Sequence, residues 1–177
     1  SVSEAPKLNT ANINFEQLEK SNTPFYTIDD INTKDIDDAI FCEKTESGWK
    51  LSVAIADVSS FIKHKDEQDK HAQSNSISFY FPHEVNHLID RALAEDFCSL
   101  NPGQPKQSMI CEVDIKQDGS IAGYNFKHQE IISHARLTYN DVDNTRKIHL
   151  TYNDESYELN LFSTIYDNAN FLVIRDG

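Results

Sequence analysis

Glycine and proline are scarce in this sequence, with five of each among 177 residues. Disordered or linker-like chains are usually rich in these residues and poor in apolar ones. Here 38% of the residues are hydrophobic, so the composition favours a globular protein. The length suits one domain with a sizeable core, because domains usually run to roughly 100–150 residues.

Cysteine is also rare, and its three positions show no C-x-x-C spacing: Cys42, Cys98 and Cys111. The printed sequence has no apolar leader and no apolar run of membrane-spanning length. These features predict reduced thiols in a cytoplasmic protein that does not associate with a membrane.

Basic residues are outnumbered, since 16 Lys and Arg face 29 Asp and Glu, for a net charge of −13. Proteins that hold nucleic acid mostly contact phosphates through Lys and Arg. The composition alone therefore argues against a nucleic-acid partner. We give the charge less weight than the motif described next, because bound metal would offset part of the acidity.

The most informative stretch runs from Thr27 to Ile40, where an aspartate-rich segment lies between two apolar runs that predict strands. Its five aspartates are Asp29, Asp30, Asp35, Asp37 and Asp38. Carboxylates crowded onto one loop raise each other's pKa, and a cation removes the cost of their repulsion. Hard oxygen ligands suit Mg²⁺ or Mn²⁺ rather than zinc, and such ions serve phosphodiester cleavage.

Two other interpretations fit this stretch less well. A solvated acidic surface loop has a similar composition, but here predicted core strands fix both ends and Lys34 is the one cation inside it. A calcium loop of the EF-hand type needs glycine at its sixth position, where a start at Asp30 or Asp35 gives Asp35 or Ile40.

The frame Thr27-Ile-Asp-x5-Asp-x-Asp-Asp-Ala39 resembles the signature of the RNB family, the catalytic domain of ribonuclease II and ribonuclease R. Further segments follow in the family's order and at about its spacing, namely residues 53–58, 80–82, 98–100 and 133–139. The resemblance runs from about residue 24 to residue 139 and covers the first half of such a domain. Residues 87–90, His-Leu-Ile-Asp, depart from the family's Pro-Met-Leu-Pro segment.

The resemblance implies hydrolysis of single-stranded RNA from its 3′ end to nucleoside 5′-monophosphates, with Mg²⁺ or Mn²⁺ as cofactor. It implies Asp29, Asp35 and Asp38 as metal ligands, and Asp35 and Asp37 as catalytic residues. It also implies that Tyr80, rather than Phe79 or Phe81, stacks on an RNA base. From the residues alone, this aromatic run predicts an edge strand with two rings on the core. DNA is not expected as a substrate.

Two further functions stay open. The family's active site also uses an arginine and a glutamate from the second half of the domain, which this sequence lacks. The chain is therefore also interpretable as a non-catalytic half-domain that binds metal or RNA weakly and needs that half and its flanking RNA-binding domains. A metal nuclease that cuts DNA, or cuts internally, would use similar carboxylates.

The predicted fold is α+β, a mixed and mostly antiparallel sheet with helices on one side. Residues 1–23 are predicted as a lead-in and 24–177 as the N-terminal half of an RNB-type domain. Hairpins are predicted at Ser47-Gly48 and Asp118-Gly119, and a strand buried on both faces is predicted at 49–57. A turn is predicted at 134–139, and helices at 63–76, 91–96, after 140 and 158–174. Asp57 is predicted to cap the following turn. His83 and His87 have a zinc-like spacing, but Pro82 and the lack of a nearby cysteine argue against zinc.

Overall fold

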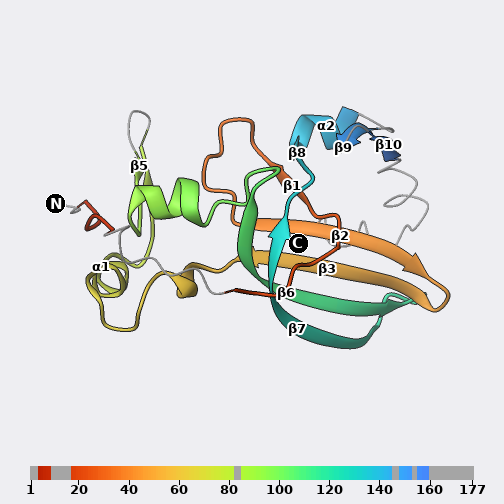
Figure 1. The fold of residues 1–177 in the computed structure, drawn as a ribbon, viewed down its shortest axis with the longest axis horizontal. Helices are drawn as coiled ribbons and strands as arrows, with labels where there is room; N and C mark the ends of the chain where they lie inside the picture. The colour runs from red at the N-terminus through yellow and green to blue at the C-terminus, as the bar shows by residue number, and fades with distance from the viewer. Residues whose placement is uncertain (1–3, 9–16, 82–84, 145–147, 153–154, 160–177) are drawn as a thin grey trace.

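The computed structural model describes residues 4–8, 17–81, 85–144, 148–152 and 155–159, which form one six-stranded sheet and two two-stranded sheets with few helices (Figure 1). The large sheet has the order β7-β6-β3-β2-β1-β8, with β1 at Tyr26–Asp29, β2 at Asp38–Thr45, β3 at Gly48–Ala56, β6 at Pro105–Lys116, β7 at Ile121–Ile132 and β8 at Ala135–Thr138. All its neighbours are antiparallel except β1 and β8. The predicted mixed, mostly antiparallel sheet is confirmed.

The smaller elements are the 3-10 helix η2 at Val58–Ser60, α1 at Glu67–Asn75, β4 at Phe79–Tyr80, β5 at Val85–Asn86, the π-helix η3 at Leu93–Phe97, α2 at Tyr139–Asn144, β9 at Ile148–Tyr152 and β10 at Glu155–Leu159. Figure 1 shows α1 and the green π-helix together beyond one end of the large sheet. None of the helices in the described ranges is long and apolar enough to cross a bilayer.

The core lies against one face of the large sheet. Its fully buried apolar members include Phe25, Ile36, Ala54, Leu93, Leu100 and Ile110. Along β3, Ser52, Ala54 and Ala56 are buried, whereas Ile55 is 47% exposed. The prediction that this strand is buried on both faces is therefore wrong. The alternation of an antiparallel sheet places every second residue on the core and leaves the others on the opposite face.

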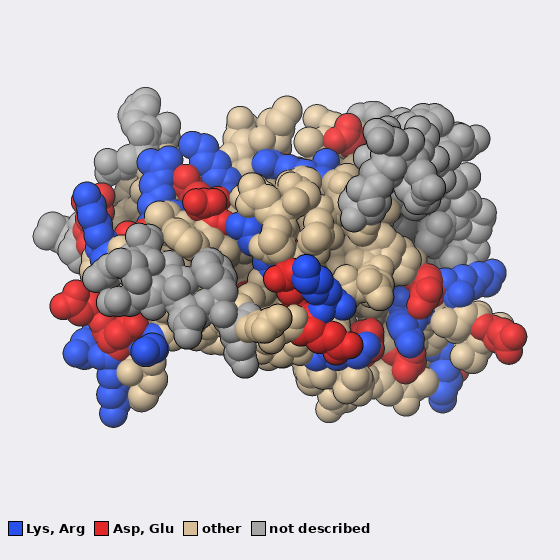
Figure 2. All heavy atoms as spheres, viewed as in Figure 1, with Lys and Arg blue, Asp and Glu red and all other residues tan. Residues whose placement is uncertain are grey.

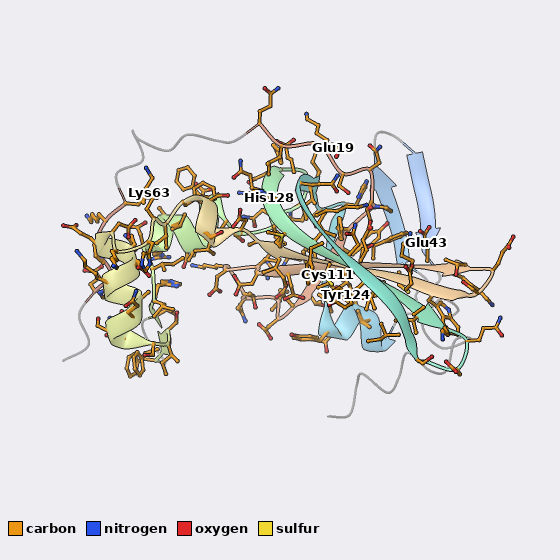
Figure 3. The ribbon with its side chains drawn as sticks, turned by 90° about the horizontal axis from the view of Figure 1, so that it is seen from below. Glu19, Glu43, Lys63, Cys111, Tyr124 and His128 are labelled. Atoms are coloured by element: carbon orange, nitrogen blue, oxygen red, sulfur yellow. The ribbon has the colours of Figure 1, made fainter. Side chains whose placement is uncertain are left out.

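That opposite face is apolar and open. Its exposed members, named here the open apolar face, are Ile55, Met109, Tyr124 and Phe126. The register pairs Ile55 with Met109 and Cys111 with Phe126, so these side chains project to one side of β3, β6 and β7. Tyr124 lies along the β6–β7 ribbon in Figure 3, and its ring meets that of Phe126 edge-on with centroids 5.7 Å apart.

Several local predictions are confirmed, including both hairpins, α1 and the short helix α2. Two others, at residues 134–139 and 158–174, are corrected. Residues 135–138, predicted as part of a turn, form β8, because pairing with β1 overrides the local signal. The predicted short helix at 91–96 is present, as residues 91–92 and the π-helix that follows them, and only its helix type was not predicted. Of the predicted helix at 158–174, Glu158 and Leu159 belong to β10, and the rest lies outside the described residues.

Gly48 begins β3 in a backbone conformation that only glycine adopts easily, with φ of +149°. A Cβ atom here would lie 1.9 Å from the carbonyl oxygen of Ile115 on β6. We expect Gly48→Ala to lower the free energy of unfolding by roughly 2–4 kcal/mol, measured by urea unfolding. Gly123→Ala is the control, since a Cβ atom there meets no atom within 4 Å. Equal urea midpoints for the two variants would contradict the expectation.

Candidate active site

The predicted aspartate loop joins two neighbouring strands of the large sheet. Asp29 ends β1 and Asp38 begins β2. The two strands are antiparallel, with Tyr26 opposite Ile40, so the end of β1 and the start of β2 lie at the same end of the sheet. The eight residues between them, 30–37, form the loop. The fold therefore carries the aspartate frame at one sheet end, as the sequence predicts.

Four of the five aspartates interact electrostatically. Desolvation raises the pKa of the Asp29 carboxyl, and the charges of Asp38 and Asp35 raise it further. The pKa of Asp37 is also raised. Desolvation is the largest cause, although the residue as a whole is exposed, and the charges of Asp35, Asp38 and Asp29 follow. The structure therefore brings together Asp29, Asp35, Asp37 and Asp38.

The fifth aspartate has a local structural role. The Oδ1 atom of Asp30 accepts hydrogen bonds from the backbone nitrogen of Asn32 at 2.9 Å and from its side-chain amide at 3.1 Å. Such bonds are typical of aspartate in a turn. Asp30 is thus set apart from the other four by its contacts, in agreement with its place outside the predicted frame.

The donor chemistry of the cluster fits a hard divalent cation. The Oδ2 atom of Asp29 is buried and has no hydrogen-bond partner among the described residues, and a buried carboxylate oxygen without a donor is costly unless a cation satisfies it. The ligand geometry is not preassembled, however, because no three His, Cys, Asp or Glu side chains in the described ranges are grouped as metal ligands. Mutual repulsion keeps carboxylates apart, and a cation would have to draw them together.

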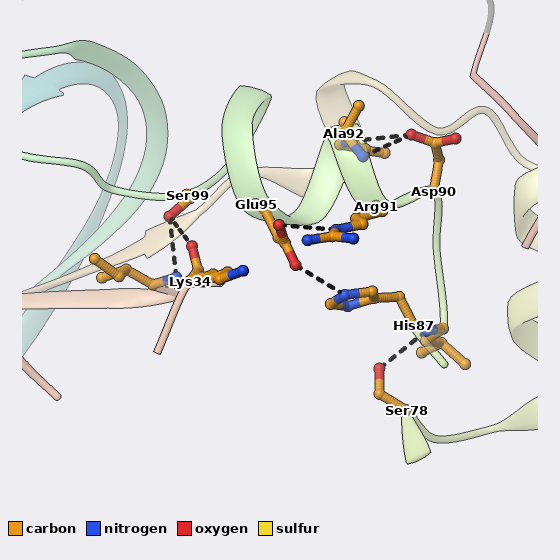
Figure 4. Close-up of polar contacts among 11 residues, drawn as sticks. Lys34, Ser78, His87, Asp90, Arg91, Ala92, Glu95 and Ser99 are labelled. Carbon is orange, nitrogen blue, oxygen red and sulfur yellow. Dashed lines mark hydrogen bonds and ion pairs between the residues drawn. The ribbon is translucent and has the colours of Figure 1, made fainter. Parts of the chain in front are cut away.

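The second half of the loop is anchored by Ser99, from the 98–100 segment. Its Oγ atom donates to the carbonyl oxygen of Lys34 at 2.8 Å and accepts from the backbone nitrogen of Ile36 at 3.1 Å (Figure 4). The backbone nitrogen of Leu100 also donates to the carbonyl oxygen of Ile36 at 2.9 Å. Because Ile36, Ser99 and Leu100 are fully buried, this contact fixes the chain on either side of Asp35.

The first half of the loop contacts Arg136 of β8. One guanidinium nitrogen, Nη2, donates to the carbonyl oxygens of Asp30 at 2.7 Å, Ile31 at 3.2 Å and Thr33 at 2.7 Å. Its positive charge also acts to lower the pKa of Asp29. Neither Ser99 nor Arg136 was predicted as a site residue. The signal available was that each stands in a segment resembling the family.

Asp57, directly after β3, is not part of the cluster by its contacts. Its side chain accepts from the backbone nitrogen of Ser60 at 3.3 Å and from the hydroxyls of Ser59 and Ser60, which confirms it as the cap of η2. His128 Nε2 on β7 lies 2.7 Å from Asp57 Oδ2. Burial raises the pKa of Asp57, but these hydrogen bonds and the His128 charge outweigh it, so the pKa is lowered.

This network predicts a pH dependence of stability. A carboxyl whose pKa is lowered by folding stabilises the protein above its unfolded pKa of about 3.9, and the contribution is lost as the pH falls through the folded value. We expect Asp57→Asn to lower the free energy of unfolding at neutral pH by about 2 kcal/mol and to flatten its decline below about pH 4. Glu46→Gln, in the exposed β2–β3 turn, is the control for urea unfolding across pH. An unchanged acid limb in Asp57→Asn would contradict the expectation.

Tyr80 lies on a different element from the aspartates. It belongs to β4, which pairs with β5 in a two-stranded sheet, and its own side chain lies outside the described residues. The rings of Phe79 and Phe81 stack, with centroids 6.3 Å apart and an interplanar angle of 13°. Phe81 is 48% exposed, so a stacked aromatic surface is open to solvent beside Tyr80.

His87 has a protein partner in place of the zinc that its spacing allowed. Its Nε2 atom lies 3.2 Å from Glu95 Oε1, and Glu95 also pairs with Arg91 at 3.0 Å (Figure 4). His83 lies outside the described residues. Within the described ranges the interaction of His87 is therefore a structural one between the residue after β5 and the π-helix.

On the side seen in Figure 2, the described Lys and Arg side chains are interspersed with Asp and Glu and form no continuous basic surface. A continuous basic track is the usual footprint of nucleic-acid binding.

Comparison with known proteins agrees with the family resemblance of the sequence motifs. A family model described as the RNB domain matches residues 16–169. Ribonuclease R of Escherichia coli is 39% identical over 127 residues, covering 71% of this chain and 16% of that protein. Exoribonuclease 2 of Psychromonas ingrahamii is 39% identical over 132 residues, or 72% of this chain and 20% of that protein. The solved Mycoplasma genitalium RNase R in complex with double-stranded RNA matches with a TM-score of 0.77 and 25% identity, over 96% of this chain and 30% of that one. The chain thus spans a fifth or less of these two curated relatives.

Proposed function

This chain belongs to the RNB family, and from that membership we propose that it provides the aspartate-bearing first part of the catalytic domain of a 3′-to-5′ exoribonuclease. The proposed substrate is single-stranded RNA, and the proposed products are nucleoside 5′-monophosphates. The proposed location is the cytoplasm. The observation that carries the proposal is the electrostatically coupled cluster of Asp29, Asp35, Asp37 and Asp38 at one sheet end.

The proposed cofactor is Mg²⁺, with Mn²⁺ as a substitute, held by Asp29, Asp35 and Asp38. When bound, such ions activate a water and stabilise the charge on the leaving 3′ oxygen. The chain itself holds these carboxylates in position. Paired strands carry Asp29 and Asp38, and the anchored loop carries Asp35. Asp35 and Asp37 are the proposed catalytic residues, with Asp37 placed beside the ligands to orient the water or a second ion.

Tyr80 is the proposed stacking residue for an RNA base. Stacking of this kind contributes roughly 1–3 kcal/mol per base and tolerates any base, because every base has an aromatic face. The exposed ring of Phe81, stacked on Phe79, supports an aromatic contact surface at this element. Since β4 lies outside the large sheet, RNA would be held by one element and cleaved at another.

An RNA assay tests the proposal. A polypeptide that carries this chain within a complete RNB domain is incubated with Mg²⁺ and single-stranded RNA labelled at its 5′ end. Stepwise shortening from the 3′ end is expected, with a short end-product and nucleoside 5′-monophosphates. Internal fragments, or cleavage of single-stranded DNA, would support a different metal nuclease. RNA that stays intact would contradict the proposal.

A second candidate is that the chain alone is a non-catalytic half-domain. The open apolar face favours it, because Tyr124 is 70% and Phe126 60% exposed, as is typical of a surface that packs against further polypeptide. A transition-state arginine supplied from elsewhere in the domain can contribute about three to five orders of magnitude in phosphoryl transfer. The same assay on the 177-residue chain decides: intact RNA supports the half-domain, and shortening supports an autonomous enzyme.

A further inference from the structure

We propose that Arg136 is the positioning residue of the aspartate loop, and that its hydrogen bonds to the loop backbone set the affinity of the site for a divalent cation. The inference rests on the proposed function, because it assumes that the carboxylates bind such an ion. Arg136 is assigned no contact with the ion or with RNA. It acts through the backbone of the loop.

The first observation is the convergence of three carbonyl oxygens on one side chain. Asp30, Ile31 and Thr33 all accept from Nη2 of Arg136, and the backbone nitrogen of Thr33 donates to the carbonyl oxygen of Asp30 at 3.0 Å. The turn is thus folded around the guanidinium. Three carbonyl groups can point at one centre only if the backbone of the whole turn is fixed.

The second observation is that the tip of the loop gains little from apolar packing. Ile31 is 73% exposed, and Asp30 and Asn32 bond to each other within the turn. A contact from a distant, half-buried side chain on a strand is therefore a strong constraint on this segment. The parallel pairing of β1 and β8 provides it, since Arg136 lies opposite Thr27, two residues before Asp29.

The third observation is that the loop is held from two sides. Arg136 holds residues 30–33, and Ser99 holds Lys34 and Ile36. Asp35 lies within the Ser99-anchored part, and Asp29 immediately precedes the part held by Arg136. A change at Arg136 would therefore shift the spacing between these two carboxylates, while the buried Ile36 end stays in place.

Arginine suits this role better than lysine. Its guanidinium is a planar group with five N–H donors that keeps its charge at any accessible pH, whereas lysine presents a compact, strongly hydrated ammonium. Because the three bonds end on backbone carbonyls, they add a positive charge to an acidic loop without occupying carboxylate oxygens. Replacing Arg136 by Lys keeps the positive charge but loses the fixed arrangement of hydrogen-bond donors. This variant therefore separates the effect of the charge from the effect of the hydrogen bonds.

The experiment measures Mn²⁺ binding to the full 177-residue chain by the EPR signal of free Mn²⁺. Removing the positive charge of Arg136 from an acidic site would, by charge alone, strengthen Mn²⁺ binding. Weaker Mn²⁺ binding in the variant would therefore show that Arg136 acts by positioning the loop. We expect Arg136→Met to weaken binding about tenfold or more, the range found for residues that orient metal ligands. Arg136→Lys is expected to weaken it less, with faster amide hydrogen exchange at Asn32 and Thr33 in both variants. Arg91→Met, at an exposed arginine paired with Glu95, is the control and should bind like the parent.

The outcomes separate this inference from the proposed function. Saturable Mn²⁺ binding that is equal or tighter in a folded Arg136→Met chain, even with a lower melting temperature, would overturn the positioning role and leave the proposed metal site standing. Absence of saturable Mn²⁺ binding by the parent would overturn the proposed metal site, and the positioning role with it. If Arg136→Met does not fold, Arg136→Lys decides alone: parental affinity overturns the role and weaker binding supports it.

Discussion

Replacing Asp37 by Asn is expected to slow RNA shortening by about three to four orders of magnitude, the loss typical of removing one member of a catalytic group. The measurement uses a polypeptide that carries this chain within a complete RNB domain, under single-turnover conditions. Asparagine has the size of aspartate and lacks its charge, so the fold is retained. RNA binding is expected to stay close to the parental value, because base stacking does not depend on this carboxylate.

Asp30→Asn is the matched control for this prediction. It makes the same chemical change in the same loop, but Asp30 lies outside the frame and uses Oδ1 only as an acceptor for Asn32. An amide oxygen can accept the same two bonds, so near-parental cleavage is expected. Parental cleavage by Asp37→Asn would show that the role of Asp37 is wrongly assigned. Equal losses in both variants would point to the loop's net charge instead.

Asp38→Asn is expected to change the stability of the chain in opposite directions with and without divalent ions. The charge of Asp38 raises the pKa of both Asp29 and Asp37, so the ionised carboxylates destabilise one another in the folded state. In the presence of EDTA the variant should therefore melt at a higher temperature than the parent. At a Mn²⁺ concentration of about 100 times the dissociation constant, the parent gains about 2.7 kcal/mol. The variant, with one ligand fewer, gains much less.

The order of the two melting temperatures should thus reverse when EDTA is replaced by Mn²⁺. Asp118→Asn is the control, because Asp118 lies in the exposed β6–β7 turn and bonds to Ser120. It removes the same charge far along the chain from the aspartate loop and should show no reversal. Equal Mn²⁺-induced shifts in the parent and in Asp38→Asn would exclude Asp38 as a ligand.

The features predicted from sequence are those encoded by neighbouring residues. The turn at Asp118-Gly119 between alternating strands, and Asp57 two residues before Ser59-Ser60, specify their structures within a few residues. The aspartate loop was predictable for the same reason, since apolar runs bound it on both sides. Burial of β3 was not, because an apolar strand sequence does not say whether another layer covers its second face.

The parts that escaped prediction depend on distant residues. The strand β8 has a weak local signal, and its structure comes from pairing with β1. The hydrogen bonds from Ser99 to Lys34 and from Arg136 to Asp30 join residues 65 and 106 positions apart. Contacts of this kind end on backbone atoms, which every residue has, so no residue type on the receiving side indicates them. The aspartates were therefore identified, and the side chains that hold their loop were not.

The parallel pairing of β1 with β8 sets the order in which a newly made chain can complete its site. Asp30 and Arg136 are 106 residues apart, and ribosomes add about 5–20 residues per second. At that pace, the aspartates leave the ribosome roughly 5–20 seconds before Arg136, whose side chain binds the backbone of their loop. Closing so long a segment also costs chain entropy, which favours earlier formation of the local hairpins. A polypeptide cut short before β8 would carry all five aspartates and still be unable to hold them in register.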